Sequence, residues 1–269
     1  MNFIKMHGLG NDFIIFDGRQ ESISLSKSII EALADRHKGI GCDQIARIGE
    51  SQSCYATLEF WNSDGSKSDT CGNATRCIGD ILFKETDAKH LTLETGERKI
   101  ECRRDGKTTS VNMGSPLTEW HEIPLSKKVN TIALDLDGSP TATSMGNPHC
   151  TFFVDDINSM NIETLGSKIQ RCGLFPQGTN VQMAKIIDRN TVKAKIWERG
   201  SGVTLSSGSS SCAIVAAGVR RGLLDKMVDI ESDGGKLNVN WNQDGIWIKG
   251  STSVVFQGTV SKSFLEEIK

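Results

Sequence analysis

Two short segments of the chain carry residue types suited to proton transfer. They are Cys71-Gly72-Asn73 and Ser207-Gly208-Ser209, and each lies at the start of a predicted helix. Backbone N–H groups and the helix dipole at such a start favour anions, and they lower the pKa of a thiol placed there. The pattern indicates a site that grips a carboxylate and moves a proton beside it.

The two segments occupy equivalent positions in an internal repeat. A shift of 136 residues relates these pairs: Asn147 to Asn11, Asn180 to Gln44, Trp197 to Trp61, Ser207 to Cys71, and Gly208 to Gly72. Two copies of one module predict two domains related by a pseudo-twofold axis. A site is expected in their shared cleft, with residues 71 and 207 on opposite faces of one ligand.

The repeat predicts the same order of elements in both halves. In the first half we expect a strand, a helix, a strand and an apolar helix, at Phe13–Asp17, Ser26–His37, Ala56–Trp61 and Cys71–Lys84. In the second half the corresponding segments are Cys150–Asp155, Ile162–Cys172, a strand through Ile196-Trp197, and Cys212–Leu224. The later helix of each half is apolar almost all round, which predicts a helix enclosed by a curved sheet. The predicted fold class is α+β, with two pseudosymmetric barrel-like halves, each a curved, mainly antiparallel sheet around a central helix.

The domain boundary is predicted from a short segment that contains glycine and proline. Met113-Gly-Ser-Pro116 is followed by a polar stretch. We therefore expect the domains to be 1–117 and 118–269, with the C-terminal tail free to return to the first half.

Composition excludes several classes of function. The chain has 269 residues, a hydrophobic content of 37% and a formal net charge of −2, with no basic stripe of the kind that binds nucleic acid. No apolar run approaches membrane-spanning length, and the N-terminus lacks the apolar core of a signal peptide. We expect a cytoplasmic protein whose eight cysteines are thiols rather than a disulfide framework. The sequence contains no CxxC pair, so a structural metal site is not expected.

Each chemical signal has a structural alternative. A cysteine such as Cys71 is often only a small buried residue. The segment Ser206–Ser211 has the composition of a flexible linker, although it stands between a strand and a helix. His149 beside Cys150 suggests a Cys–His hydrolase, but a packed or hydrogen-bonding histidine beside the cleft is the preferred interpretation.

Six motifs, in order, closely resemble the diaminopimelate epimerase family. They are Met6–Phe13, Asp35–His37 with Gly39–Gly41, Asn62–Gly65, Cys71–Cys77, Met145–His149 and Trp197–Gly200, and the resemblance runs from Met1 to about Val260. It implies two pseudosymmetric domains, a cofactor-independent epimerisation at one α-carbon of diaminopimelate, and a homodimer. No cofactor and no metal are expected.

The resemblance also implies roles for individual residues. Cys71 resembles one catalytic acid/base, and the helix starts Gly72-Asn73 and Gly208-Ser209 resemble the grip on the reacting carboxylate. Asn11 and Gln44 resemble polar groups near the reacting end. The distal amino-acid head of the substrate is expected to contact the following set: Asn62, Asn147, Asn180, Arg199 and the backbone of Glu198.

The chemistry agrees with these roles. An α-hydrogen beside an ionised carboxylate is very weakly acidic, and many enzymes remove it with pyridoxal phosphate or a metal. A site without such a cofactor needs dense electrostatic stabilisation, exclusion of water, and an acid and a base on opposite faces. A thiol at a helix start can serve as either the acid or the base near neutral pH.

Ser207 departs from the family pattern. Thr-Leu-Ser-Ser-Gly stands where the family has Thr-Leu-Ala-Cys-Gly, so a hydroxyl replaces the second catalytic thiol. Cys212 lies about 140° further round the helix and is an unlikely substitute. Three interpretations stay open: an inactive variant that still binds the ligand, a slow epimerase, or a relative with another substrate, such as a histidine racemase.

Overall fold

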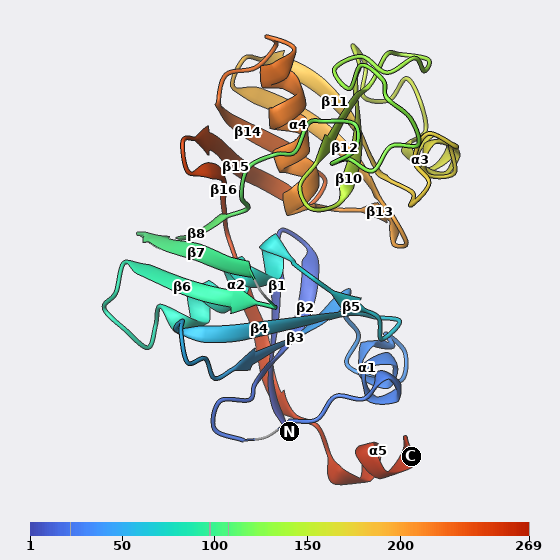
Figure 1. Ribbon diagram of the computed structural model, residues 1–269. Helices are drawn as coiled ribbons and strands as arrows, with labels where there is room; N and C mark the ends of the chain where they lie inside the picture. Colours follow the sequence, from blue (N-terminus) through green and yellow to red (C-terminus); the bar gives the residue numbers. More distant parts are fainter. Residues whose placement is uncertain (22, 97, 107, 269) are drawn as a thin grey trace. The chain divides into compact units, whose positions relative to one another are not determined.

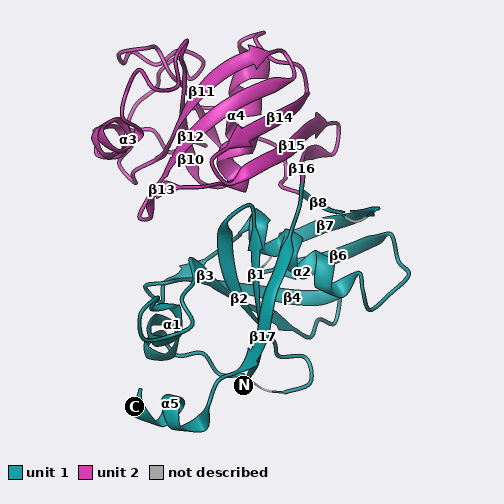
Figure 2. Ribbon diagram, turned by 180° about the vertical axis from the view of Figure 1, so that it is seen from behind, with its two compact units in different colours: residues 1–111, 250–269 teal, residues 112–249 magenta. Residues whose placement is uncertain are grey.

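The computed structural model describes residues 1–21, 23–96, 98–106 and 108–268, and these form two compact units. The first unit comprises Met1–Val111 with Gly250–Lys269, and the second comprises Asn112–Lys249 (Figure 2). The boundary therefore lies between Val111 and Asn112, not between Leu117 and Thr118 as the segment with glycine and proline suggested. The C-terminal segment belongs to the first unit because its strand pairs with the strand at the N-terminus.

The first unit is built on one sheet with helices beside it (Figure 1). Its elements are β1 (Asn2–Gly8), β2 (Asn11–Asp17), α1 (Lys27–Ala34), β3 (Gln44–Gly49), β4 (Ala56–Asn62), β5 (Lys67–Ser68), α2 (Gly72–Leu82), β6 (His90–Thr95), β7 (Arg98–Asp105), β8 (Thr108–Asn112), β17 (Ser253–Thr259) and α5 (Lys262–Glu267). The strands lie in the order β17-β1-β2-β3-β4-β6-β7-β8, with β5 also paired to β4. The pairs β2–β3 and β4–β6 are parallel, and the other pairs are antiparallel.

The second unit repeats this plan. Its elements are β9 (Thr141–Ser144), β10 (Pro148–Phe153), α3 (Ile162–Gln170), β11 (Asn180–Asp188), β12 (Thr191–Glu198), β13 (Gly202–Thr204), α4 (Gly208–Arg220), β14 (Met227–Ser232), β15 (Gly235–Asn242) and β16 (Gly245–Gly250). The strand order is β9-β10-β11-β12-β14-β15-β16, and β10–β11 and β12–β14 are again the parallel pairs.

The repeat extends to the register of the hydrogen-bonded strands. Phe13 lies opposite Gln44 in the first unit, and His149 lies opposite Asn180 in the second. The members of these two pairs are related by the same shift of 136 residues that relates the sequence motifs. The predicted duplication is therefore confirmed at the level of individual backbone pairs.

Each unit encloses a central helix, as the apolar periodicity predicted. Helix α2 packs against β1, β2 and β7, and α4 packs against β9, β10, β11 and β15. These strands are separated in the sheet order, so each sheet has to curve around its helix to make both sets of contacts. Almost every residue of either helix is buried. The α+β fold class is confirmed.

The other long helix of each unit covers the opposite side of its sheet. Ile30 and Leu33 of α1 join a core cluster with Phe16 of β2. Ile162 and Ile169 of α3 join an equivalent cluster with residues of β10 and β11. These two hydrophobic clusters hold each sheet in place, and each sheet in turn positions the start of its enclosed helix.

Several helix ends differ from the sequence predictions, including the C-terminal end of α4, which lies at Arg220 rather than Leu224. Helix α4 begins at Gly208 rather than Cys212, because the Ser207 hydroxyl caps it and accepts from the backbone N–H of Ser210 at 3.4 Å. The linker interpretation of Ser206–Ser211 is therefore wrong. Helix α1 ends at Ala34 rather than His37, because Asp35 turns out of the helix and its carboxylate accepts from the next amides.

Five thiols lie in the two cores. Cys42, Cys77, Cys102, Cys150 and Cys212 are buried and free. Burial raises the pKa of the Cys77 and Cys102 thiols to about 12, so these groups stay protonated near neutral pH. In the described part of the chain, no helix combines the length and apolar character needed to cross a membrane.

Candidate active site

Cys71 stands at the start of the central helix of the first unit. It adopts an extended backbone conformation as the N-cap of α2, and its Sγ accepts from the Ala74 N–H at 3.4 Å. The first amides of a helix have no carbonyl partner within the helix, so those of Gly72 and Asn73 are placed to receive an anion. The half-buried thiol therefore lies at the start of a helix, as the sequence predicted, and the assignment of this helix start to carboxylate binding stays a prediction.

Asn73 and Asn11 are brought together by α2 and the β1–β2 turn. The Asn73 Nδ2 donates to Asn11 Oδ1 at 3.3 Å, and Asn11 Nδ2 donates to Asp43 Oδ2 at 2.8 Å. A carboxylate only accepts and a guanidinium only donates, so the orientation of both amides is fixed. At the far end, Arg76 Nη2 donates to Asn73 Oδ1 at 2.8 Å.

Gln44 and Asn62 form a second polar pair in the same unit. They lie opposite each other in β3 and β4, and Gln44 Nε2 donates to Asn62 Oδ1 at 2.8 Å. Asn62 Nδ2 donates in turn to the Ser66 hydroxyl at 2.9 Å. The sequence assigned these two residues to different ends of the substrate, and the structure places them side by side.

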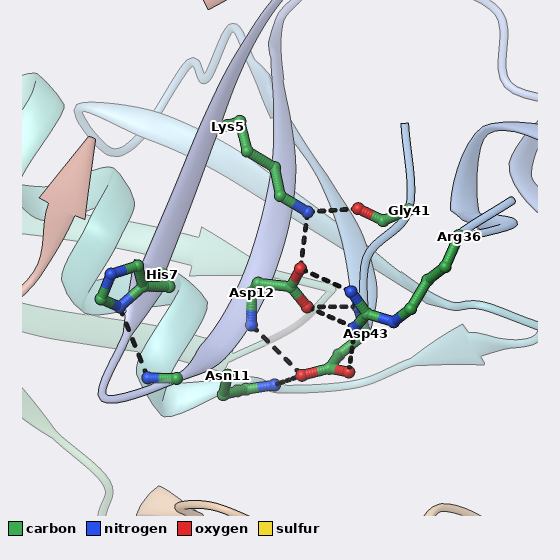
Figure 3. A network of polar contacts seen from close by, with 8 residues as sticks. Lys5, His7, Asn11, Asp12, Arg36, Gly41 and Asp43 are labelled. Atoms are coloured by element: carbon green, nitrogen blue, oxygen red, sulfur yellow. Dashed lines mark hydrogen bonds and ion pairs between the residues drawn. The ribbon is translucent and has the colours of Figure 1, made fainter. Parts of the chain in front are cut away.

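A charged network beside Asn11 was not predicted. The Asp12 carboxylate accepts from both terminal nitrogens of Arg36, at 3.0 and 2.7 Å, and from Lys5 Nζ at 2.6 Å (Figure 3). Arg36 also bridges to Asp43, whose other oxygen receives the Asn11 amide. Lys5 donates further to the Gly41 carbonyl. The network fixes the turn between β1 and β2 and thereby positions Asn11.

The network perturbs the titration of Asp12. Burial raises the pKa of its carboxyl group, but the hydrogen bonds and charges of Arg36 and Lys5 outweigh this effect and lower the pKa to about 2. The carboxylate is thus ionised throughout the physiological range. A planar guanidinium suits this double contact better than the point charge of a lysine.

Ser207 occupies the equivalent helix start in the second unit. It is the N-cap of α4 in an extended conformation, and its side chain is buried. The Ser207 hydroxyl donates at 2.9 Å to Oε2 of Glu198, the last residue of β12. The sequence assigned only the backbone of Glu198 to the site, whereas here its carboxylate contacts the predicted catalytic position.

His149 belongs to a buried polar chain rather than to a Cys–His pair. Gln182 Nε2 donates to His149 Nδ1 at 3.0 Å, and His149 Nε2 donates to Asn147 Oδ1 at 2.8 Å. Burial, followed by the positive charge of Arg199, lowers the pKa of His149 to about 3, so the ring is neutral. Gln182 also donates to the Ser210 hydroxyl of α4 at 3.1 Å. This series of hydrogen bonds orients Asn147 relative to the start of α4.

Asn180 and Arg199 meet at the end of β12. Asn180 Oδ1 accepts from the backbone N–H of Arg199 at 2.9 Å, and Asn180 Nδ2 donates to the Pro148 carbonyl at 2.9 Å. The Arg199 side chain is exposed and donates to the Gln177 carbonyl at 2.8 Å. Among the residues that the structure describes, the other guanidinium donors of Arg199 have no hydrogen-bond partner.

The predicted residues thus gather into clusters within each unit. They are completed by residues to which the sequence assigned no role: Lys5, Asp12, Arg36, Asp43, Arg76 and Gln182. Arg36 lies in a motif that was recognised without a role. Gln182 lies on a buried strand with no chemical pattern around it. Among the residues described, no group of three or more histidine, cysteine or acidic side chains could hold a metal ion.

Solved structures define the fold class. A phenazine biosynthesis protein of the PhzF family from Bacillus anthracis matches with a TM-score of 0.69 and 15% identity, over 97% of this chain and 99% of that one. A hydroxyproline epimerase from Agrobacterium vitis matches with a TM-score of 0.68 and 13% identity, over 97% of this chain and 90% of that one. These likenesses place the chain in the fold class that these two proteins share.

Sequence comparison then identifies the family. The model described as diaminopimelate epimerase matches residues 3–118 and 141–260. A diaminopimelate epimerase of Acidiphilium cryptum is 41% identical, over 98% of this chain and 97% of the relative. One of Rhodospirillum centenum is 38% identical, over 98% of this chain and 93% of the relative. The chain belongs to the diaminopimelate epimerase family, which confirms the resemblance of its motifs.

The Asp12 network predicts an acid-sensitive part of the protein's stability. A carboxyl group whose pKa falls on folding contributes stability above its unfolded pKa, near 3.9, and loses it as the pH falls through the folded value. We expect Asp12 to contribute about 2 kcal/mol to the free energy of unfolding at pH 7. This contribution should disappear between about pH 4 and pH 2, as measured by denaturant unfolding at a series of pH values.

The Asp12→Asn variant should lack this pH-dependent part and be less stable at neutral pH. Asp137→Asn is the matched control, because the Asp137 side chain is fully exposed. It should keep the acid dependence of the parent protein. Parallel stability curves for the parent and Asp12→Asn would contradict the assignment.

Proposed function

We propose that this chain epimerises diaminopimelate at one α-carbon without pyridoxal phosphate, with Cys71 and Ser207 as the acid/base pair. The observation that carries the proposal is the equivalence of the two helix starts. Cys71 and Ser207 are the N-caps of α2 and α4, the central helices of two units with the same strand order and register. Family membership favours diaminopimelate over the alternative amino acids that the sequence left open.

In this mechanism the Cys71 thiolate removes the α-proton from one face and Ser207 supplies a proton to the other. The amides of Gly72, Asn73, Gly208 and Ser209 stabilise the carboxylate and the carbanion-like state. The mechanism requires that both side chains come within reach of one α-carbon when the substrate is bound. Asn11 and Gln44 are assigned to the reacting end.

The serine makes the two directions unequal. A hydroxyl is far less acidic than a thiol, and each unit of pKa corresponds to about 1.4 kcal/mol of additional cost for forming the anion. The hydrogen bond from Ser207 to Glu198 gives the hydroxyl proton an acceptor when Ser207 acts as a base. We infer that this contact reduces the penalty of the serine only in part.

The first functional prediction concerns Ser207→Cys. With the serine, the isomer that presents its α-hydrogen to Cys71 should exchange that hydrogen for deuterium in D₂O. Net epimerisation should be depressed by about two orders of magnitude or more, which is the lower range for a lost acid–base group. Ser207→Cys should restore turnover in both directions, measured by NMR of L,L- and meso-diaminopimelate.

Ser207→Ala provides the matched control, because it removes the hydroxyl without adding a thiol. If the parent protein already epimerises both isomers as fast as Ser207→Cys, then Ser207 is not a catalytic acid/base. A parent protein that binds diaminopimelate but exchanges neither α-hydrogen would indicate a ligand-binding variant instead.

We assign the distal amino-acid head of the substrate to the polar residues Asn147, Asn180 and Arg199 of the second unit. Asn147 is oriented by neutral His149, and Asn180 holds the backbone of Arg199. The exposed guanidinium of Arg199 can bind a carboxylate through two parallel hydrogen bonds. Asn62 and the Glu198 backbone complete this assignment, which supports a substrate with two amino-acid heads.

Arg199→Lys should weaken binding of diaminopimelate by about tenfold, because a lysine cannot reproduce the two parallel contacts. It should have little effect on a ligand with a single carboxylate, such as alanine. Isothermal titration with both ligands measures the difference, and Arg171→Lys, at the exposed residue directly after α3, is the control. Equal losses for both ligands would remove Arg199 from the distal site.

We also propose a homodimer formed through β17. This strand pairs with β1 along one edge, and it exposes 44% of Val254, 55% of Val255 and 47% of Phe256. Apolar side chains on such a strand are a liability unless another surface covers them. A second copy can cover them through the same patch under twofold symmetry, which is the commonest way in which identical subunits associate.

Val255→Asp should convert the dimer into a monomer in light scattering of the eluted protein. Gln52→Glu, at an exposed position between β3 and β4, adds one charge away from β17 and should leave the dimer intact. A parent protein that is monomeric at micromolar concentration would contradict the proposal.

The proposed location is the cytoplasm. Free buried thiols such as Cys42, Cys77 and Cys102 are typical of a reducing compartment. Fractionation of the source cells tests this, and recovery of the protein outside the cytoplasmic fraction would contradict it.

A further inference from the structure

Arg76 is a buried cation at the start of the helix that carries Cys71. It is fully buried, and it lies in the first half of α2. Its Nη2 donates to Asn73 Oδ1 at 2.8 Å, and its Nη1 donates to the Ser251 carbonyl at 3.1 Å. A β-carbon at Gly8 would lie 3.0 Å from the guanidinium, so the absence of a side chain there makes room for it.

The charge of Arg76 has no carboxylate partner among the residues that the structure describes. Its two named contacts are with neutral oxygens, and its Nε, also buried, has no hydrogen-bond partner. An isolated charge is costly to bury, and buried charges are ordinarily paired. The arrangement is therefore stabilised by any negative charge that forms nearby.

Cys71 is the group that can supply this negative charge. Burial lowers the pKa of Arg76, and the anionic forms of Cys77 and Cys71 act in the opposite direction. Cys77 does not ionise near neutral pH, because burial raises its pKa to about 12. Cys71 is half-buried and lies at the helix start, where the dipole also favours an anion.

The second unit lacks this cation at the equivalent position. The shift of 136 residues brings Cys212 onto Arg76, and burial raises the pKa of the Cys212 thiol well above its usual range. The Ser207 hydroxyl instead donates to the carboxylate of Glu198. One helix start thus has a buried positive charge beside it, and the other has a negative charge.

We propose that Arg76 is a positioning residue that stabilises the Cys71 thiolate, and thereby assigns Cys71 the role of the base. The cation does not touch the reacting atoms; it changes the protonation state of the residue that does. This inference deepens the proposed function, since it concerns the same site. Its test uses no substrate, so the two can fail independently.

The test is the pH dependence of Cys71 alkylation by iodoacetamide, followed by mass spectrometry of the Cys71 peptide. Only the thiolate reacts, so the midpoint of the profile reports the pKa of Cys71. Arg76→Gln should raise this midpoint by about one pH unit and slow alkylation at neutral pH about tenfold. Arg76→Lys, which retains the charge, should lie close to the parent protein.

Arg104→Gln is the matched control. Arg104 donates to the Phe83 carbonyl at 2.8 Å, at the opposite end of the same helix. The substitution removes the same charge and a guanidinium contact with α2, but it should leave the Cys71 profile unchanged. An equal shift in this variant would show that the effect is not specific to Arg76.

Two further measurements keep the test decisive if Arg76→Gln does not fold. The parent protein alone should show a Cys71 midpoint below the ordinary cysteine value of about 8.5. Gly8→Ala should displace the guanidinium without removing it and raise the midpoint. A parent midpoint at or above 8.5, or identical profiles for the parent and a folded Arg76→Gln or Gly8→Ala variant, would overturn the proposal.

Discussion

A helix that is buried along nearly its whole length has to satisfy the N–H groups of its first turn without much help from water. In α2 and α4, the cap side chain accepts one of these groups: Cys71 accepts from Ala74, and Ser207 accepts from Ser210. The preceding amides remain as donors that an anion can occupy. The enclosure of each helix and the donor groups at its start thus have one structural origin.

The features that could be predicted from the sequence are those that depend on neighbouring residues. The helix starts, the repeat and the enclosed helices follow from short-range patterns: a cap residue, a glycine and a continuous apolar face. The boundary near Val111 and the return of the C-terminal strand depend on the pairing of β1 with β17. That pairing joins opposite ends of the chain, so the segment Met113–Pro116 does not indicate it.

The polar groups behind the helix starts could not be predicted for a similar reason. Lys5, Asp12, Arg36 and Asp43 come from separate segments, and their two positive and two negative charges meet only after folding. Arg76 lies within the Cys71–Cys77 motif, and nothing in the sequence indicates that its charge is fully buried. His149 pairs with Gln182 of the neighbouring strand rather than with Cys150, since adjacent residues of a strand point to opposite faces. The charge environment of a buried side chain and the tautomer of a histidine can therefore be assigned only once the contacting residues are known.

The return of the last strand also affects the order in which the protein can be built during synthesis. The second unit is a continuous segment between two parts of the first, so all of it leaves the ribosome before β17 does. Domains generally fold as units during synthesis, and the second can be complete while the first still exposes the free edge of β1. The Ser251 carbonyl that receives Arg76 arrives with the same late segment. The Cys71 helix therefore lacks this contact until the last segment has been synthesised, by which time the whole of the second unit has been made.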